Sequence, residues 1–260
     1  MIDTHTHLYL PEYGEDKCAV VDRALAAGVT MMVLPGVDSS TIAPIRQLHQ
    51  LRPQATAMCI GLHPTDVRVD DWQRELTTII NEAREHSDYV AIGEMGLDLY
   101  WEQDKLNFQL EVCEAQLDLA DALGLPAVMH CRDAMPQMLD LLNARRGRLP
   151  HMVFHCYSGT ADDVTALRRI QPDVMFGIGG VVTFKKSPLP DILPVIGINH
   201  ILLETDAPWL APVPMRGKQN ESAYVPFIAA RIAQELQIPI DEVDLITTKS
   251  ANTFFKLKDS

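Results

Sequence analysis

The chain has 260 residues, of which 47% are hydrophobic and 22% are charged, and its formal net charge is −13 at pH 7. This composition is typical of a soluble globular protein with a sizeable core. An acidic surface repels nucleic acid, so a polyanionic substrate would require a local basic patch or bound metal ions. No run approaches the ~18 apolar residues of a membrane helix, so we expect no membrane span.

The N-terminus and the cysteines predict the compartment. Asp3, His5 and His7 interrupt any apolar stretch at the start of the chain, so we expect no secretory signal. The five cysteines are far apart and form no C-x-x-C pair, so neither a disulfide framework nor a structural zinc site is expected. We therefore expect a cytoplasmic protein with reduced thiols.

The chain opens with MIDTHTHLYL, in which one threonine separates His5 from His7. In a β-strand, residues i and i+2 point to the same face, so both imidazoles would aim at one point. Two imidazoles that converge in this way suggest a metal site. A disordered N-terminus with two exposed histidines is the alternative, and this stretch alone does not distinguish the two.

Short apolar runs typical of buried strands recur along the chain and alternate with helix-length segments. One such segment, residues 107–124, has apolar residues at three- and four-residue spacing and ends at Gly124, with Pro126 just beyond. With residues 2–7, the runs predict eight strands, the others at 30–36, 55–64, 89–94, 126–130, 151–156, 173–180 and 200–206. Eight buried strands that alternate with helices predict a (β/α)₈ TIM barrel, and we expect a single domain over residues 1–260. A doubly wound open sheet is the alternative, but no glycine-rich phosphate loop follows the first run.

Imidazoles and carboxylates collect at the C-terminal ends of the predicted strands, where the active site of such a barrel lies. They are His5, His7, His63, Glu94, His130, His155 and Asp206. The other histidines differ, because His49 and His86 fall in predicted helices while His151 and His200 begin strands at the opposite rim. Seven such groups close together on one rim would destabilise the fold by their desolvation and charge unless bound cations neutralise them. Nitrogen and carboxylate ligands suit zinc, manganese, iron or nickel, and two ions about 3.5–4 Å apart that share a carboxylate would use them all.

These residues lie in a series of motifs with a specific order: DTHTHL, GLHP, AIGEMGLD, LPAVMHCRDA, FHCYSG, GGVVTF, LLETDAPWLAP and PMRGKQNES. The series resembles the TatD family of metal-dependent deoxyribonucleases, a branch of the amidohydrolase-like metal hydrolases. The resemblance implies one divalent ion held by His5, His7, Glu94 and Asp206. It implies a second ion held by Glu94, His130 and His155, with Glu94 bridging, and it places His63 near the ions and the scissile phosphate.

The activity that the resemblance implies is cleavage of phosphodiester bonds in single-stranded or frayed DNA ends, as a 3′-to-5′ exonuclease. A water activated by two divalent ions (zinc, manganese or magnesium) would attack phosphorus. Asp206 and Glu94 are the expected catalytic residues, and Asp206 can accept the proton of the water because it lies beside it at a rigid strand end. Glu204, two residues earlier, is expected one layer deeper. There it either orients a ligand or is a purely structural buried carboxylate.

Few cations are available to hold such a substrate. Arg132 and Arg216 are expected to contact it, and the other cations in loops on the predicted rim are Lys185, Lys186 and Lys218. An unpaired base could stack on Phe184, Trp101 or Trp209, although each of these is also suited to the core.

Two other functions would use the same residues. One is an ester or amide hydrolase, such as an aminoacyl-tRNA deacylase, because activated water attacks carbonyls as readily as phosphates. The other is a non-catalytic metal-binding protein. We expect a nucleic-acid substrate, DNA rather than RNA, and neither a membrane nor an obligate protein partner.

Overall fold

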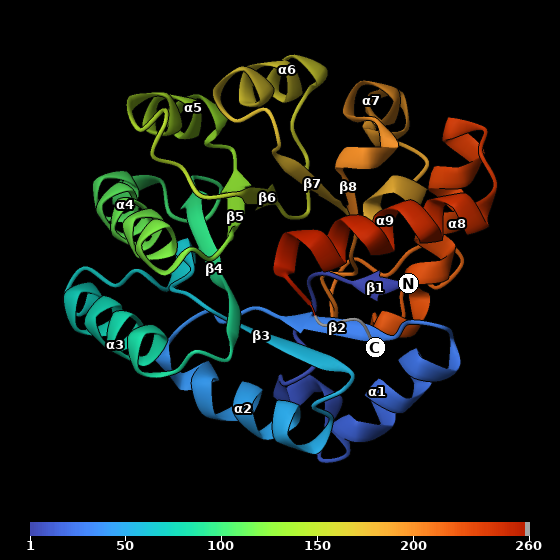
Figure 1. Cartoon of the computed structure of the whole chain (residues 1–260), viewed down its shortest axis with the longest axis horizontal. Coiled ribbons are helices and arrows are strands. Elements are labelled where there is room, and N and C mark those ends of the chain that lie inside the picture. Colours follow the sequence, from blue (N-terminus) through green and yellow to red (C-terminus); the bar gives the residue numbers. More distant parts are fainter. Residues whose placement is uncertain (258–260) are drawn as a thin grey trace.

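The computed structural model describes residues 1–257 of the chain. Eight parallel strands form one sheet in the order β1 to β8, and helices alternate with them around the outside, which confirms the predicted (β/α)₈ barrel (Figure 1). The strands are β1 (Ile2–Asp3), β2 (Met31–Leu34), β3 (Thr56–Ile60), β4 (Tyr89–Asp98), β5 (Ala127–Arg132), β6 (Met152–Phe154), β7 (Met175–Ile178) and β8 (Ile201–Leu203). The helices are α1 (Lys17–Ala26), α2 (Ile42–Leu51), α3 (Trp72–Glu85), α4 (Leu106–Leu123), α5 (Met135–Ala144), α6 (Ala161–Ile170), α7 (Leu189–Ile196), α8 (Val225–Leu236) and α9 (Ile240–Phe255).

The first and last strands close the barrel through the segments that follow them. The backbone N–H of Thr4 donates to the carbonyl of Leu203 at 2.9 Å, and that of Asp206 donates to the carbonyl of His5 at 2.9 Å. His7 N–H continues the pairing with a 2.8 Å hydrogen bond to the carbonyl oxygen of residue 207. These bonds hold His5, His7 and Asp206 side by side, although they come from opposite ends of the chain.

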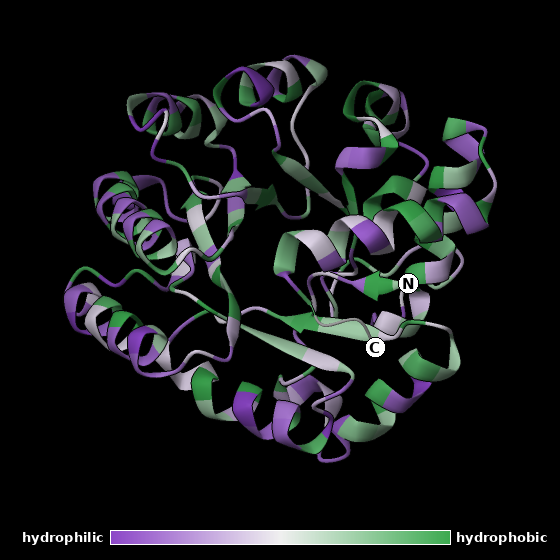
Figure 2. Cartoon of the chain, in the orientation of Figure 1, coloured by the Kyte–Doolittle hydropathy of each residue, from purple (hydrophilic) through white to green (hydrophobic). Residues whose placement is uncertain are grey.

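Two apolar layers stabilise the barrel. The outer layer lies between the strands and the helices, which carry both apolar and polar faces (Figure 2). The inner layer fills the N-terminal end of the barrel with side chains from every strand, such as Val33, Val128 and Leu202. Helix α9 lies across this end (Figure 1), and its Phe255 packs against the inner layer with 1% of its surface exposed. The barrel therefore has an apolar floor, which leaves its other end for polar chemistry.

The two-residue alternation of the strands places polar side chains directly above this floor. In β5, Val128 belongs to the floor and His130 is the next residue on the same face. In β8, Leu202 belongs to the floor, and Glu204 and Asp206 follow it at two-residue intervals. Glu204 is fully buried, one layer below the partly exposed Asp206.

Strand β4 is longer than the sequence predicts. The predicted strand ends at Glu94, whereas β4 continues to Asp98, and its register with β5 shifts around Glu94. Gly93 and Gly96 have φ angles of 148° and 146°, and a Cβ on Gly96 would collide with the carbonyl oxygen of His130. The predicted end at Glu94 was wrong, because these two glycines permit a bulge in a strand that continues to Asp98.

Local sequence sets the helix ends. Helix α4 ends at Gly124, which has a left-handed φ of 63°, as the sequence predicts. Helix α6 begins with a capping box, in which Thr160 Oγ1 accepts from Asp163 N–H at 3.2 Å and Asp163 Oδ2 accepts from Thr160 N–H at 2.8 Å. Such caps satisfy backbone groups that a helix end leaves unpaired. Within residues 1–257, no helix is long and apolar enough to cross a membrane.

Candidate metal centre

A cavity of about 670 Å³ opens at the C-terminal ends of the strands. Ligand sites usually have volumes of about 300–1,000 Å³. Six of the seven predicted imidazoles and carboxylates line it, namely His7, His63, Glu94, His130, His155 and Asp206. The seventh, His5, lies behind them with 1% of its surface exposed. The structure thus brings the whole predicted set together.

Glu94 lies at the centre of this set, and its two oxygens face different histidines. Its Oε2 lies 3.2 Å from His5 Nε2 and 3.7 Å from His7 Nε2. Its Oε1 lies 2.8 Å from His130 Nδ1 and 2.6 Å from His155 Nε2. One buried carboxylate therefore connects two groups of nitrogen atoms, which is the geometry of a bridging ligand.

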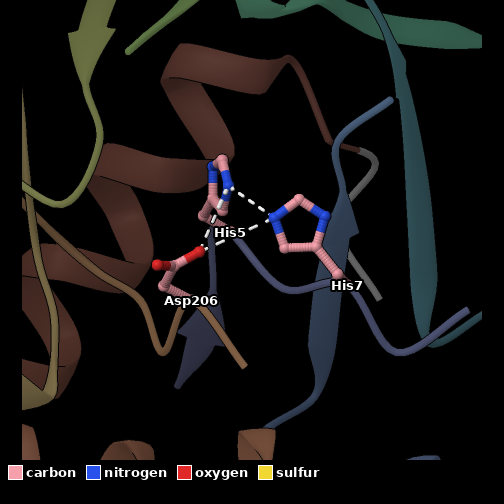
Figure 3. A group of neighbouring side chains, drawn as sticks. All are labelled: His5, His7 and Asp206. Atoms are coloured by element: carbon pink, nitrogen blue, oxygen red, sulfur yellow. Dashed lines mark hydrogen bonds and ion pairs between the residues drawn. The ribbon is translucent and has the colours of Figure 1, made fainter. Parts of the chain in front are cut away.

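The first half of the centre consists of His5, His7 and Asp206, which converge from the segments after β1 and β8 (Figure 3). The Nε2 atoms of the two histidines are 3.2 Å apart. Asp206 Oδ1 lies 3.8 Å from His5 Nε2 and 3.6 Å from His7 Nε2. In Figure 3, all three side chains point toward one common centre.

The second half consists of His130 and His155, on the other side of Glu94. Their facing atoms, His130 Nδ1 and His155 Nε2, are 3.3 Å apart. His63 precedes a short 3₁₀ turn, Pro64–Asp66, and its Nε2 lies 3.1 Å from Glu94 Oε1 and 3.3 Å from His130 Nδ1. His63 is thus adjacent to this half, as the sequence analysis expects.

These distances fit divalent metal ions. Zinc–nitrogen bonds of about 2.0–2.1 Å place neighbouring atoms of a tetrahedral site roughly 3.3–3.4 Å apart. The nitrogen–nitrogen distances of 3.2 Å in the first half and 3.3 Å in the second match this spacing. Ring nitrogens that face one another so closely in a buried place require a proton or a cation between them. The donor set, nitrogen and carboxylate oxygen, suits first-row transition metals.

The carboxylates are held in their ionised form. Burial alone would raise the pKa of Glu94, but the surrounding imidazoles, that of His155 first, outweigh burial and hold this pKa well below its ordinary value. Burial also acts against the ionised form of Asp206, yet its hydrogen bond with His7 and nearby imidazole charges lower its pKa below 3.8. Both groups are therefore available at neutral pH as ligands or proton acceptors.

Two residues outside the predicted set orient the rings of two histidines. The Nε2 of His130 lies 2.9 Å from Asp98 Oδ2, which can only accept when ionised, so Nδ1 is left to face Glu94. The Nδ1 of His7 lies 2.8 Å from the Tyr9 hydroxyl, which donates its own proton to the carbonyl of Pro35 at 2.6 Å. His7 therefore donates through Nδ1 and keeps Nε2 for the centre. Such partners fix the tautomer and the orientation of a ligand ring.

Tyr9 and Asp98 are not among the predicted site residues, although the sequence contains a signal for both. Tyr9 follows His7 by two residues and Asp98 follows Glu94 by four, so each occupies the same face of an extended chain as a predicted ligand. The expectation that β4 ends at Glu94 concealed Asp98, which is the true last residue of the strand.

Glu204 lies beneath the centre among polar atoms that lack partners. Its Oε1 accepts from the N–H of Cys156 at 2.5 Å and lies 3.9 Å from His155 Nδ1. Within the described part of the chain, Glu204 Oε2 and the Nδ1 atoms of His5 and His155 have no hydrogen-bond partner. Burial, followed by the charge of Asp206, raises the pKa of Glu204 well above its ordinary value. A protonated carboxyl at this position can both donate and accept.

The predicted cations and aromatic residues separate into two groups. Arg132, at the end of β5, lines the cavity, as do Trp101 and Trp209. The guanidinium of Arg216 stacks 4.0 Å from the ring centre of Phe184. Among the described residues that line the cavity, none is Phe184, Lys185, Lys186, Arg216 or Lys218. Arg132 is therefore the predicted cation that lines the cavity of the candidate metal centre.

Comparisons with known proteins agree with this arrangement. The family model described as TatD related DNase matches residues 2–256. A metal-dependent hydrolase of Bacillus subtilis, YabD, is 34% identical over 258 residues, which cover 99% of each chain. A protein of Enterobacter lignolyticus named 3′-5′ ssDNA/RNA exonuclease TatD is 37% identical over 242 residues, which cover 90% of each chain.

A solved structure shares both the fold and part of the sequence. The crystal structure of YJJV, a TatD homologue from Escherichia coli K12, has a TM-score of 0.90 to this chain at 25% identity. The alignment covers 99% of this chain and 98% of that chain. Since the family model matches nearly the whole chain and relatives above 30% identity cover it end to end, this protein belongs to the TatD-related DNase family of metal-dependent hydrolases.

Proposed function

We propose that the protein hydrolyses phosphodiester bonds in single-stranded nucleic acid or frayed DNA ends, from the 3′ end, and prefers DNA to RNA. The observation that carries this proposal is Glu94, whose two oxygens face nitrogen ligands on both sides, in a cavity that also contains Arg132. The name of the Enterobacter lignolyticus relative, a 3′-5′ ssDNA/RNA exonuclease, supports the same reaction.

Two divalent ions per chain, zinc, manganese or magnesium, are part of this proposal. His5, His7, Asp206 and Glu94 Oε2 would hold one ion, and Glu94 Oε1, His130 and His155 would hold the other. When bound, such a pair polarises a phosphoryl oxygen and lowers the pKa of water.

The chain itself supplies a proton acceptor, Asp206. The side chain of Asp206 is 16% exposed, whereas those of Glu94 and Glu204 are 4% and 1% exposed. Asp206 is therefore the carboxylate of the three that water in the cavity reaches most readily. Its lowered pKa keeps it ionised, so it can take the proton of the attacking water. Arg132 would bind a phosphate next to the one that is cleaved.

The activity is tested with one metal-loaded preparation on matched substrates. Single-stranded DNA and RNA oligonucleotides labelled at the 5′ end, their duplexes, and an aminoacyl ester are incubated with the protein, and products are resolved by length. We expect a ladder that shortens from the 3′ end, fastest with single-stranded DNA. Hydrolysis of the acyl ester without cleavage of any oligonucleotide would contradict the proposal.

Two arginines provide a matched pair of variants. Arg132→Ala should raise KM for an oligonucleotide roughly 10- to 100-fold, as the loss of a charge-assisted contact does, and should flatten its salt dependence. Arg216→Ala removes the same charge from a position outside the cavity wall, so KM should change by less than about twofold. Equal effects of both substitutions would show that general charge, and not a contact of Arg132, attracts the substrate.

A further inference from the structure

Two of the three tryptophans lie at the mouth of the cavity with much of their surface exposed. Trp101 is 65% exposed and Trp209 is 49% exposed, and both line the cavity. The third, Trp72, is 9% exposed and packs near Phe108 between α3 and α4. Large exposed aromatic rings next to a cavity indicate a binding surface, because burial elsewhere would be more stable by about 1.5–3 kcal/mol or more for each ring.

The two exposed indoles belong to segments that follow opposite strands of the barrel. Trp101 follows β4 and Trp209 follows β8, and in a ring of eight strands these two are diametrically opposed. The ring of Trp209 lies edge-on to that of His7, with 5.3 Å between the centroids. Trp209 therefore adjoins the first half of the centre.

Trp101 is tied to the second half through one carboxylate. Asp98 Oδ1 accepts from the backbone N–H of Trp101 at 2.8 Å, while Asp98 Oδ2 lies 2.9 Å from His130 Nε2. The carboxylate that orients a candidate ligand thus also fixes the loop that carries the indole. The metal centre therefore lies between the two segments that carry the indoles.

The guanidinium of Arg132 lies near Trp101. It is 3.9 Å from the ring centre of Tyr100 and 5.7 Å from that of Trp101. Arginine on aromatic rings and exposed indoles beside a positive charge are the features with which proteins bind unpaired bases and their phosphates. A base inside a duplex has its faces covered by its neighbours, so this surface selects single strands.

We propose that Trp101 and Trp209 each stack on one of the two unpaired bases that flank the phosphodiester at the metal centre. The proposal rests on the proposed nuclease function and specifies how the substrate is recognised. Stacking is tolerant of sequence because every base has a π-face. The protein therefore selects unpaired nucleotides of any sequence at the two positions next to the cleaved bond.

The test combines single tryptophan variants with single abasic sites. Binding of a short single-stranded oligonucleotide is measured in the Asp206→Asn background, which slows cleavage, with the base removed on one or the other side of the terminal phosphodiester. Removing either base should weaken binding to the parent roughly 5- to 150-fold, the usual effect of one stacked base. In Trp101→Ala one of these losses should vanish while the other persists, and in Trp209→Ala the pattern should reverse.

Tryptophan fluorescence provides a second readout. Stacking on a base should quench emission in the parent and in Trp72→Phe, whose indole lies away from the cavity. Quenching should fall by about half in each single variant Trp101→Phe and Trp209→Phe. Unchanged metal content and melting temperature verify that each variant is folded.

The outcomes separate this inference from the nuclease proposal. If the unmodified protein cleaves oligonucleotides but both abasic losses persist in both alanine variants, the stacking inference is wrong and the nuclease proposal stands. If the unmodified protein neither binds nor cleaves any oligonucleotide, both are wrong. A loss that disappears in both variants at the same position would show one shared base, which contradicts the assignment of one base to each indole.

Discussion

The two halves of the candidate metal centre place similar side chains on different parts of the fold. His5, His7 and Asp206 lie beyond the last residues of two short strands, β1 and β8, where the barrel closes. His130 lies within β5, a six-residue strand that pairs with the ten-residue β4. His155 lies one residue beyond the three-residue β6, which pairs with β5. The first half therefore depends on the closure of the barrel, whereas the histidines of the second half come from two neighbouring, paired strands.

The halves also differ in the pKa of their histidines. Burial, reinforced by the charge of His155, lowers the pKa of His5 to about 3. Burial would lower the pKa of His130 as well, but its hydrogen bonds to Asp98 and Glu94 raise this pKa to about 9. At neutral pH an ion must therefore displace a proton from His130 but not from His5. Both residues are histidines, so the groups that hydrogen-bond to each ring, more than the type of ligand, set how metal binding responds to pH.

The largest expected effect comes from a change confined to the first half. Asp206→Asn keeps the shape and one ligand oxygen but removes the proton acceptor, so turnover on an oligonucleotide should fall roughly 10²- to 10⁴-fold. The ion held by Glu94, His130 and His155 should remain, with little change in melting temperature. Steady-state kinetics with elemental analysis measure both. Near-normal turnover with both ions bound would show that Asp206 is not the proton acceptor.

Substituting the residues that hydrogen-bond to His130 and His7 should weaken metal binding in one half at a time. Asp98→Asn should lower metal affinity of the second half roughly 10- to 100-fold, because His130 loses its charged acceptor. Tyr9→Phe should lower affinity of the first half by about 2- to 12-fold, because His7 loses a neutral acceptor. Calorimetric titration with zinc measures both sites. If either substitution weakened the two sites equally, the halves would not be independent.

The pH dependence of metal binding distinguishes the halves directly. His130 is protonated below its pKa of about 9, so the affinity of the second half should rise about tenfold per pH unit up to about pH 9 and then level off. His5, with a pKa of about 3, should add no slope above pH 5. Titrations in buffers of different ionisation enthalpy should detect about one proton released on binding to the second half at pH 7.

The raised pKa of His130 also affects the stability of the metal-free protein. A pKa raised from 6.5 to about 9 on folding contributes stability that is complete below pH 6.5 and is lost as pH rises through 9. The melting temperature of the metal-free protein should therefore fall over this interval. In Asp98→Asn the fall should be smaller, and an identical fall in both proteins would exclude His130 as its source.

The smallest effect is expected beneath the centre, where the halves meet. Burial raises the pKa of Glu204 well above its ordinary value and so favours the neutral carboxyl, which Glu204→Gln replaces with another neutral group. Turnover should change only a few-fold, within about 1 kcal/mol, and far less than in Asp206→Asn. Glu204→Ala, which leaves the N–H of Cys156 unpaired, should destabilise the protein by about 1–3 kcal/mol. A loss in Glu204→Gln as large as in Asp206→Asn would identify Glu204 as a second proton acceptor.

The sequence by itself determined the architecture and the composition of the site. Alternating apolar runs and amphipathic segments predict eight strands and their helices, because each pattern reports burial within one element. Parallel strands end at the same rim, so His130, His155 and Asp206 could be expected to meet without any knowledge of their distances. Ends marked by local chemistry, such as Gly124, were equally predictable.

Only the tertiary structure decided how those residues are supported. The bulge in β4 depends on its register with β5, and this register places Asp98 against His130. Arg132, at the end of β5, lies in the cavity wall, whereas the loop that carries Arg216 places it on Phe184, although both arginines looked alike in sequence. The physical reason is that a side-chain pattern specifies which face of an element is buried, whereas contacts between elements depend on register and loop geometry, which arise only when the barrel closes.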